Sequence, residues 1–173
     1  MFSRGFAWLG RLRRIGAGYR FLAGTLLLML AFYAALYQPY AEGSLPAHLL
    51  GGYLELVARG SALGLRWLGE AVTVEGTTVS GRFPFVVVLD CAALDAQALF
   101  AAAVLAFPAR LKDKLLGLGA GLLAIAGINM ARLVLLYFAG TRSLRLFQVL
   151  HEEVLVLLII LLVCGLFVAW ARW

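Results

Sequence analysis

Apolar residues fill four long runs along this chain, and short polar or basic turns separate the runs. The runs cover 21–37, 92–108, 115–139 and 147–170. A helix needs about 20 apolar residues, and no fewer than about 17, to cross the hydrocarbon core of a bilayer. The pattern therefore predicts an all-α polytopic membrane protein with about four transmembrane helices.

The segment 49–70 is also helix-like, but four charged residues and five glycines interrupt it. Each charge would cost about 3 kcal/mol in the centre of a bilayer. A helix that lies on the outer membrane interface avoids this cost, so we expect an interfacial amphipathic helix here. A spanning 49–70 would also carry the arginines of the N-terminus to the outer side, against the usual charge bias.

The stretch 72–80 alternates β-branched and polar residues around Gly76. This pattern is typical of a short hairpin. Open strands leave backbone groups unpaired in lipid, so the hairpin is expected outside the membrane. A second strand-like run, 86–89, follows it and meets the alanine-rich run at Cys91.

Composition supports the membrane assignment. Hydrophobic residues make up 64% of the 173 residues and charged residues 14%, against about 45–50% and about 25% in soluble domains.

The length allows one membrane-embedded domain, 21–173, after a basic N-terminal segment, 1–20. The net charge of +6 does not indicate a nucleic-acid partner, because in a membrane protein the positions of the charges report topology.

Basic residues gather on one side of the predicted bundle. Residues 1–20 hold five arginines among aromatic and aliphatic residues, as in an amphipathic segment on an anionic leaflet; a plain topogenic flank explains the same residues. The turn 110–114 adds three more basic residues. We therefore expect an integral, multi-pass protein of the plasma (inner) membrane with both termini in the cytoplasm.

Three chemically costly residues are predicted to lie at one level. With a helical rise of 1.5 Å per residue, Cys91 lies about 28 Å from Arg110, Arg132 about 27 Å from Lys114, and His151 about 31 Å from Arg172. All three helix ends used as reference points are cytoplasmic in the predicted topology. Cys91, Arg132 and His151 should therefore meet near the outer boundary of the membrane.

These residue types can carry out acyl transfer. A thiol needs a base to become a nucleophile, histidine can take and return a proton, and a guanidinium can stabilise an oxyanion. Four polar neighbours are candidates for substrate binding or support: Asn129, Asp95, Asp90 and Glu152.

Asp95 is one turn beyond Cys91 on the same helix face, where it would orient His151 or pair with Arg132. His151 has no second histidine at zinc-motif spacing, so neither a metal nor another cofactor is expected. Cys164 falls about 12 Å above Arg172, in the cytoplasmic half and too far from Cys91 for a disulfide.

Several short motifs occur in a recognisable order. They are Leu89-Asp-Cys-Ala-Ala-Leu94, Ala103-Val-Leu-Ala-Phe-Pro108, Lys114 with Gly117, Asn129-Met-Ala-Arg132, and His151. In this order the set resembles the exosortase/archaeosortase family over roughly 72–173, and the ending of the cysteine helix looks most like the exosortase H branch. The chain departs from the family pattern at Ala92 and Ala93, where a small polar residue and a glycine are common.

The resemblance implies a membrane-embedded cysteine transpeptidase or peptidase that acts on the outer side of the membrane. Its substrates would be exported proteins with a C-terminal motif, a transmembrane helix and a basic tail. Cys91 would be the nucleophile, Arg132 the oxyanion or carbonyl stabiliser, and His151 the general acid and base. The acceptor would be an amine or water.

Two other interpretations remain open. The chain could be a non-catalytic membrane subunit of a transporter or assembly, in which the Cys91–Arg132–His151 cluster binds a ligand or a lipid headgroup. It could also be a degenerate homologue that keeps the cluster but no longer cleaves. Neither the recognised motif nor the oligomeric state follows from the sequence.

Overall fold

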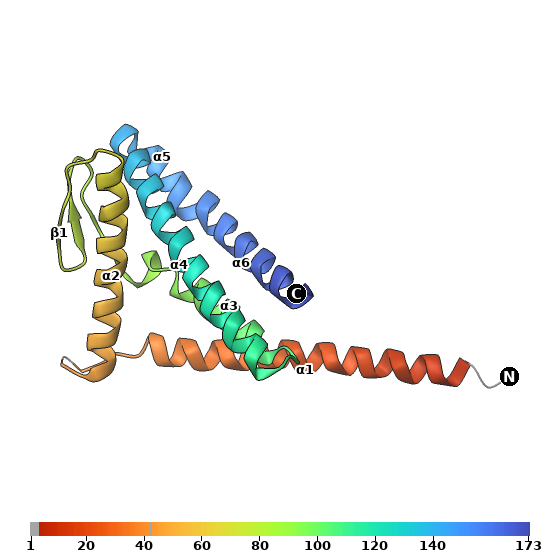
Figure 1. The fold of residues 1–173 in the computed structure, drawn as a ribbon. Helices are drawn as coiled ribbons and strands as arrows, with labels where there is room; N and C mark the ends of the chain where they lie inside the picture. The colour runs from red at the N-terminus through yellow and green to blue at the C-terminus, as the bar shows by residue number, and fades with distance from the viewer. Residues whose placement is uncertain (1–3, 42) are drawn as a thin grey trace.

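A computed structural model describes residues 4–41 and 43–173, with side chains from residue 18 onward. Helices make up most of it, as predicted, and one small sheet interrupts them (Figure 1). The helices are α1 (Arg4–Leu36), α2 (Leu45–Trp67), α3 (Leu94–Ala106), α4 (Leu111–Arg142), α5 (Leu144–Val149) and α6 (Leu155–Arg172). The short elements are β1 (Thr73–Glu75), β2 (Thr78–Ser80), β3 (Phe85–Val86), the 3-10 turn η1 (Leu89–Cys91) and the π-helical turn η2 (Leu150–Val154).

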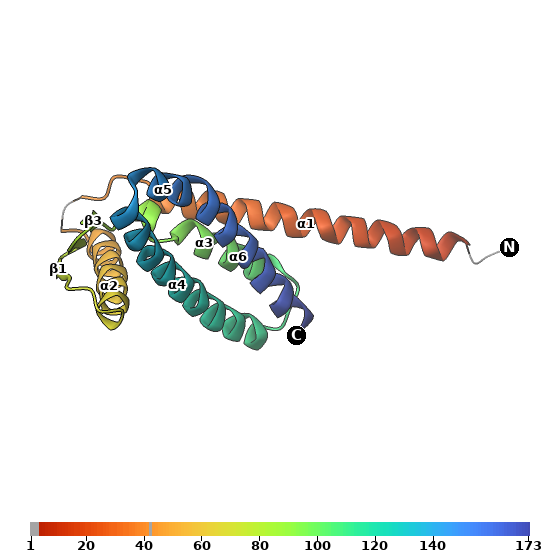
Figure 2. The same cartoon turned by 90° about the horizontal axis from the view of Figure 1, so that it is seen from above.

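The short helix α3 is the centre of the bundle. It packs against α1, α4 and α6, and the view from above shows it between α4 and α6 (Figure 2). Phe100 and Val104 of α3 meet Ile125 of α4 and Ile159 of α6 in one buried apolar cluster. This cluster joins α3, α4 and α6 in the half of the bundle away from the sheet.

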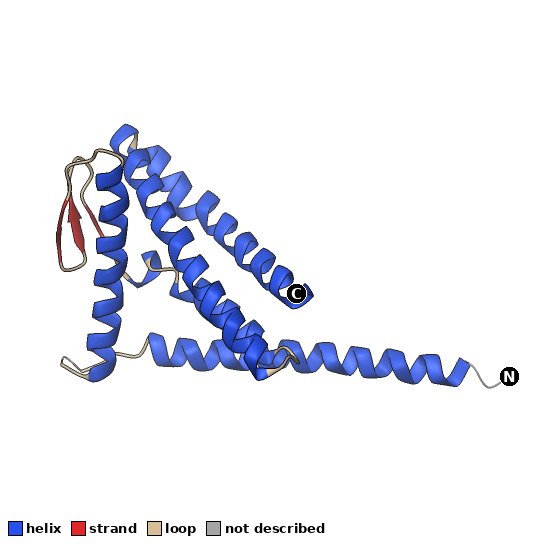
Figure 3. Ribbon diagram, in the orientation of Figure 1, coloured by secondary structure: helices blue, strands red, loops and turns tan. Residues whose placement is uncertain are grey.

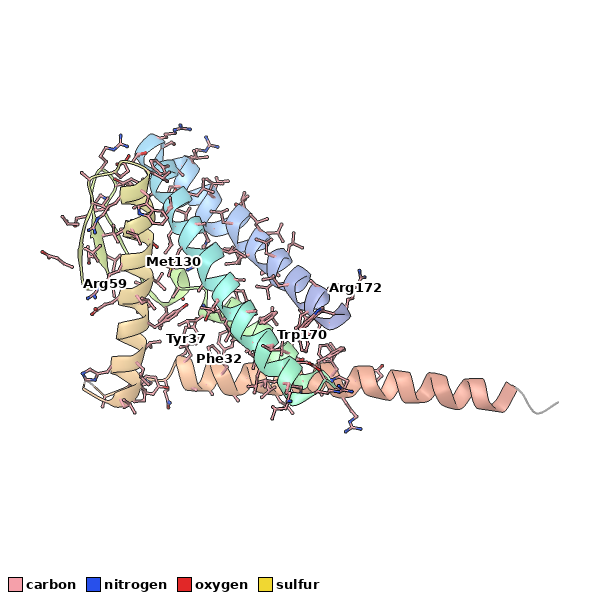
Figure 4. All side chains as sticks on the ribbon, in the orientation of Figure 1. Phe32, Tyr37, Arg59, Met130, Trp170 and Arg172 are labelled. Atoms are coloured by element: carbon pink, nitrogen blue, oxygen red, sulfur yellow. The ribbon has the colours of Figure 1, made fainter. Side chains whose placement is uncertain are left out.

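A second apolar cluster joins α2, the sheet and the last part of α4. Its members include Leu65 of α2, Val79 of β2, and Leu136 and Tyr137 of α4, all at most 3% exposed. Met130 of α4 lies beside α2 (Figure 4), where the absence of a side chain at Gly60 gives it room. Cys91 packs at the edge of this second cluster.

The structure supports an all-α membrane protein but not four full-length spans. Among the described residues, three helical stretches are long and apolar enough to cross a membrane: Gly18–Leu36, Leu111–Arg142 and Leu144–Arg172. The predicted span 92–108 is replaced by α3, which has only 13 residues. It starts late because Ala93 adopts a left-handed conformation, and it ends before Pro108, which cannot continue a helix well.

The predicted helix 49–70 is present as α2. Ser44 caps it through a hydrogen bond from the backbone N–H of Ala47, at 3.4 Å. Its buried face packs on α4 and on the sheet, while Arg59 and Glu55 form an ion pair on its exposed side. It is not among the three candidate spans, and its place at the membrane interface stays a prediction.

The predicted hairpin 72–80 is confirmed as β1 and β2, which pair in antiparallel register. Gly76, with φ of +57°, is the first residue of the two-residue turn, where glycine is favoured. The strand β3 pairs with β2 and makes a three-stranded sheet in the order β1-β2-β3 (Figure 3). It lies within five residues of Cys91.

The N-terminal helix differs from the expected division into a basic segment and a span. The helix α1 runs without a break from Arg4 through the predicted span 21–37 to Leu36. The amphipathic character of the segment 1–20 depends on side chains before residue 18, which lie outside the described part.

Close packing of α3 on α4 gives a stability prediction. A Cβ at Gly121 would overlap the ring of Phe100, which is 1% exposed, whereas a Cβ at Gly119 meets nothing within 4 Å. We expect Gly121→Ala to destabilise the protein by about 1–3 kcal/mol. Gly119→Ala should stabilise it by up to about 1 kcal/mol through helix propensity. Thermal unfolding in detergent measures both, and equal shifts would contradict this packing.

The sheet is tied to α2 and α4 by a polar network that predicts a pH dependence. Arg82 forms an ion pair with Glu70, and the hydroxyl of Tyr137 donates to the same carboxylate at 3.0 Å. The hydrogen bond from Arg82 lowers the pKa of Glu70 below its ordinary value of 4.5. A carboxylate with a lowered pKa stabilises the fold at pH values above its ordinary pKa. This contribution is lost as the pH falls through the pKa of the folded state.

We therefore expect the thermal midpoint to fall on acidification below pH 4.5. In Glu70→Gln this fall should be smaller, because the titrating group is gone. The control is Glu75→Gln, at an exposed position of β1. A pH profile of Glu70→Gln with the same slope as the wild type would rule out this network as a source of acid lability.

Candidate active site

Cys91 lies at a junction between the sheet and the helical bundle. It ends the 3-10 turn η1, and its N–H donates to the carbonyl of Val88 at 3.0 Å. Ala93 then takes φ of 53° and ψ of 29°, so α3 starts at Leu94. Cys91 is therefore not part of α3, and the expectation that the cysteine lies on the same helix as Asp95 is wrong.

Two side chains hold the backbone around Cys91. The amide of Asn129 on α4 donates to the Cys91 carbonyl at 2.8 Å. The hydroxyl of Tyr53 on α2 donates to the carbonyl of Ala92 at 3.2 Å, and Gln97 of α3 donates to that hydroxyl in turn. These contacts fix the cysteine turn to α4 and α2, and Gln97 holds the Tyr53 hydroxyl in place from α3.

The left-handed conformation of Ala93 leads to a prediction about substitution by glycine. An L-residue in this conformation costs about 1–2 kcal/mol, and glycine adopts it without that cost. The methyl groups of Ala92 and Ala93 are both buried, so each glycine variant also loses a buried methyl group worth about 0.8 kcal/mol. At residue 93 the relief of the left-handed conformation offsets this loss and the greater freedom of glycine in the unfolded chain, so we expect Ala93→Gly to be close to neutral. Ala92→Gly, at a residue with φ of −86°, has no such gain and should destabilise the protein by about 1–2 kcal/mol. Equal shifts of the two thermal midpoints would contradict the backbone geometry at residue 93.

His151 lies in the π-helical turn η2, between α5 and α6. Such turns carry an extra residue and occur frequently at functional sites. The ring of His151 stacks on Phe147 with centroids 5.3 Å apart and planes within 9°. Its Nδ1 atom is buried and has no hydrogen-bond partner among the described residues, so one ring nitrogen is free for another group.

Cys91 and His151 line the same cavity, which has a volume of about 80 Å³. The rest of its wall is apolar or aromatic. It comes from the sheet side, from α4 and from α5: Phe83, Phe85, Val86, Leu133, Leu136, Tyr137 and Phe147. The structure thus brings together two of the three residues that were predicted to lie at one level.

Arg132 lies beside this cavity but does not line it. Its side chain is buried, with the residue 9% exposed, and it donates to Asn129 Oδ1 and to the His151 carbonyl, both at 3.4 Å. Nε has no partner, and neither ion pair among the described residues involves Arg132. Arg132 therefore connects Asn129, which holds the Cys91 carbonyl, to the backbone of His151. Its positive charge has no close counter-charge in the described part of the chain.

Arg132 also lines a separate groove between α4 and α6, with a volume of about 250 Å³. The other residues along the groove are apolar: Ile128, Ala131, Leu135, Leu155, Leu158, Ile159 and Leu162. The guanidinium is therefore next to the Cys91–His151 cavity on one side and this apolar groove on the other.

The acidic neighbours do not take the predicted supporting positions. Asp95 accepts a hydrogen bond from the hydroxyl of Tyr37 at 3.3 Å, close to the end of α1 (Figure 4), and does not bond His151 or Arg132. The left-handed turn at Ala93 explains this, because it changes the direction in which the start of α3 faces. The side chains of Asp90 and Glu152 are exposed and make no hydrogen bond to a described residue.

Sequence reasoning missed the residues that shape the site. Gln97 could have been found, because it is the one amide in an alanine-rich apolar run. Tyr53 and the aromatic residues of the cavity wall gave no such signal, since aromatic residues are common in any apolar segment. Their roles depend on which helices are neighbours in space.

The arrangement combines a thiol and an unpartnered imidazole nitrogen at a small apolar cavity with a buried guanidinium beside it. Within the described residues, no three His, Cys, Asp or Glu side chains are placed to share a metal ion. These groups can support nucleophilic chemistry at the Cys91 sulfur with proton transfer through His151. Comparisons of the chain with protein-family models, curated proteins and solved structures find no match.

Proposed function

We propose that this protein is a membrane-embedded cysteine transpeptidase or peptidase that cleaves exported proteins on the outer side of the membrane. One observation carries the proposal: Cys91 and His151 share a small cavity, and His151 Nδ1 has no other hydrogen-bond partner among the described residues. A thiol beside a free imidazole nitrogen is the arrangement that nucleophilic catalysis needs. The resemblance to the exosortase/archaeosortase family points to the same chemistry.

In the proposed reaction, His151 Nδ1 takes the proton from the Cys91 thiol, and the sulfur attacks the scissile carbonyl carbon. The carbon–nitrogen bond then breaks, and the leaving amine receives the proton from His151. The product is a thioester between Cys91 and the upstream part of the substrate. An amine or water, deprotonated by His151, attacks this thioester and restores the thiol.

Arg132 is the proposed partner of the oxyanion. Its bonds to Asn129 and to the His151 carbonyl are both long, at 3.4 Å. The guanidinium can exchange the His151 carbonyl for the oxyanion through a change in its own rotamer, without movement of α4. Asn129 has the separate role of holding the Cys91 carbonyl.

The proposed substrate is an exported protein with a C-terminal motif, a transmembrane helix and a basic tail. We propose four membrane crossings with both termini in the cytoplasm, in which α3 is the short crossing. A central helix need not match the full bilayer thickness, because protein covers its ends. The contacts of α3 with α1, α4 and α6 support this assignment.

Trapping with hydroxylamine tests the thioester. Membranes that contain the protein and a reporter with such a C-terminus are treated with hydroxylamine during turnover. We expect the released upstream fragment to end in a hydroxamate, because hydroxylamine attacks thioesters. Release of a free carboxylate alone, at every hydroxylamine concentration, would argue against a thioacyl intermediate.

A second candidate function is ligand or lipid binding without catalysis. The observation in its favour is that Arg132, buried and without a counter-charge in the described residues, lines the apolar groove between α4 and α6. An anionic lipid headgroup matches this combination. In this case Arg132→Ala weakens retention of an anionic lipid during purification, Cys91→Ser is neutral, and no reporter is cleaved.

A further inference from the structure

The sheet next to Cys91 has one free edge. The strand order is β1-β2-β3, and β3 has no strand on its other side among the described residues. The free edge of a strand presents N–H and C=O groups that can pair with another extended chain. At β3 this edge lies directly before the turn that carries Cys91.

The pairing of β2 with β3 shows which residue faces outward. Phe85 lies opposite Val79, and the N–H of Val87 donates to the carbonyl of Thr77 at 2.9 Å. In an antiparallel pair, residues that exchange hydrogen bonds alternate with residues whose N–H and C=O point away. Val86 therefore directs both groups to the free edge, and it is 51% exposed.

The free edge and the cavity are continuous. Phe85 and Val86 line the cavity that Cys91 and His151 also line. A guest strand paired with Val86 would therefore run beside the cysteine and direct one of its side chains into the cavity. The cavity holds about 80 Å³ and has a mostly apolar wall, which suits a small apolar side chain better than a large or charged one.

We infer that the substrate binds as a fourth strand of this sheet, in extended form, with its main chain paired to Val86 and a small apolar side chain in the cavity. This inference rests on the proposed function, because it describes how the scissile carbonyl reaches Cys91. Main-chain pairing gives affinity for an extended segment and the cavity gives selectivity, as in other cases of strand addition. An exported chain that is extended just before its membrane helix fits such a site.

An N-methyl scan of a reactive peptide tests the inference. The probe is acetyl-Thr-Val-Ala chloromethyl ketone, with each amide N-methylated in turn, and the readout is the rate of alkylation of Cys91 by peptide mapping. Methylation of the amide that donates to the Val86 carbonyl should slow alkylation about tenfold, since it removes one hydrogen bond and blocks close approach. Methylation of the neighbouring amides should have little effect.

A variant on the protein side gives an independent test. Val86→Pro removes the N–H that points to the free edge. An edge strand tolerates proline at such a position, because this N–H makes no bond within the sheet. We expect alkylation by the peptide probe to fall about tenfold, while alkylation by iodoacetamide and the thermal midpoint stay unchanged. The matched control is Val74→Pro on β1, which removes the outward N–H of the opposite edge and should leave peptide alkylation unchanged.

The outcomes separate this inference from the proposed function. If every N-methylated peptide and the Val86→Pro variant react like their parents, strand addition is wrong although Cys91 is still the nucleophile. If the parent peptide does not alkylate Cys91 in preference to Cys164, the proposed function itself fails. If Val86→Pro does not fold, the N-methyl scan on the wild-type protein decides.

Discussion

Replacing Cys91 with alanine should abolish processing of a co-expressed reporter that ends in a motif, a transmembrane helix and a basic tail. The alanine side chain cannot form the thioester, so no slower version of the same reaction remains. We expect a loss of at least about 10³-fold, as is typical when a nucleophile is removed. The measurement is the fraction of reporter processed, read by electrophoresis at several times after induction.

The chain offers a matched control for this variant. Cys164 is the only other cysteine, and it lies exposed on α6, outside the residues that line the cavity. Cys164→Ala should process the reporter at the wild-type rate. If Cys91→Ala processes the reporter fully, Cys91 is not the nucleophile, whether or not Cys164→Ala loses activity.

Replacing His151 with alanine should slow processing by about 10²–10⁴-fold, the usual effect of a positioned acid–base group. The imidazole ring would no longer be present to take the thiol proton or to return it to the leaving amine. Alkylation of Cys91 by iodoacetamide should slow as well, because iodoacetamide reacts with the thiolate. This second readout separates loss of a base from loss of substrate binding.

His48 provides the control for histidine. It is the only other histidine, it is on α2, and its Nδ1 lies 3.0 Å from the carbonyl of Ser44. His48→Ala should leave both processing and alkylation at wild-type rates. A normal alkylation rate of Cys91 in His151→Ala would show that His151 is not the base, even if processing were lost.

The proximity of Arg132 to His151 could be predicted from the sequence, because the helical rise is regular along α4 and α6. The count to Cys91 assumed an unbroken helix back from Arg110, which the structure does not have. The basic residues near Arg110, Lys114 and Arg172 gave three independent starting points, and in the structure Arg132 contacts Asn129 and His151. Once a helix is interrupted, the number of residues no longer predicts in which direction around the axis a side chain points. The left-handed Ala93 is such an interruption, and it explains why Asp95 bonds Tyr37.

The fold class and the hairpin could also be predicted, because both depend on local periodicity. The length of α3 could not be predicted in the same way. An apolar run from 92 to 108 has the composition of a span, and only packing against α1, α4 and α6 shows that a 13-residue helix is enough at the centre of the bundle. The cavity likewise depends on contacts between the sheet, α4 and α5.

Locating the covalent intermediate on the protein tests most directly whether Cys91 is the nucleophile. Membranes that process the reporter are quenched in acid during turnover, and the protein is digested and mapped by mass spectrometry. We expect the upstream part of the reporter to be attached to the peptide that contains Cys91, through a bond that hydroxylamine cleaves. Attachment at Cys164, or active processing without any attachment at Cys91, would contradict this expectation.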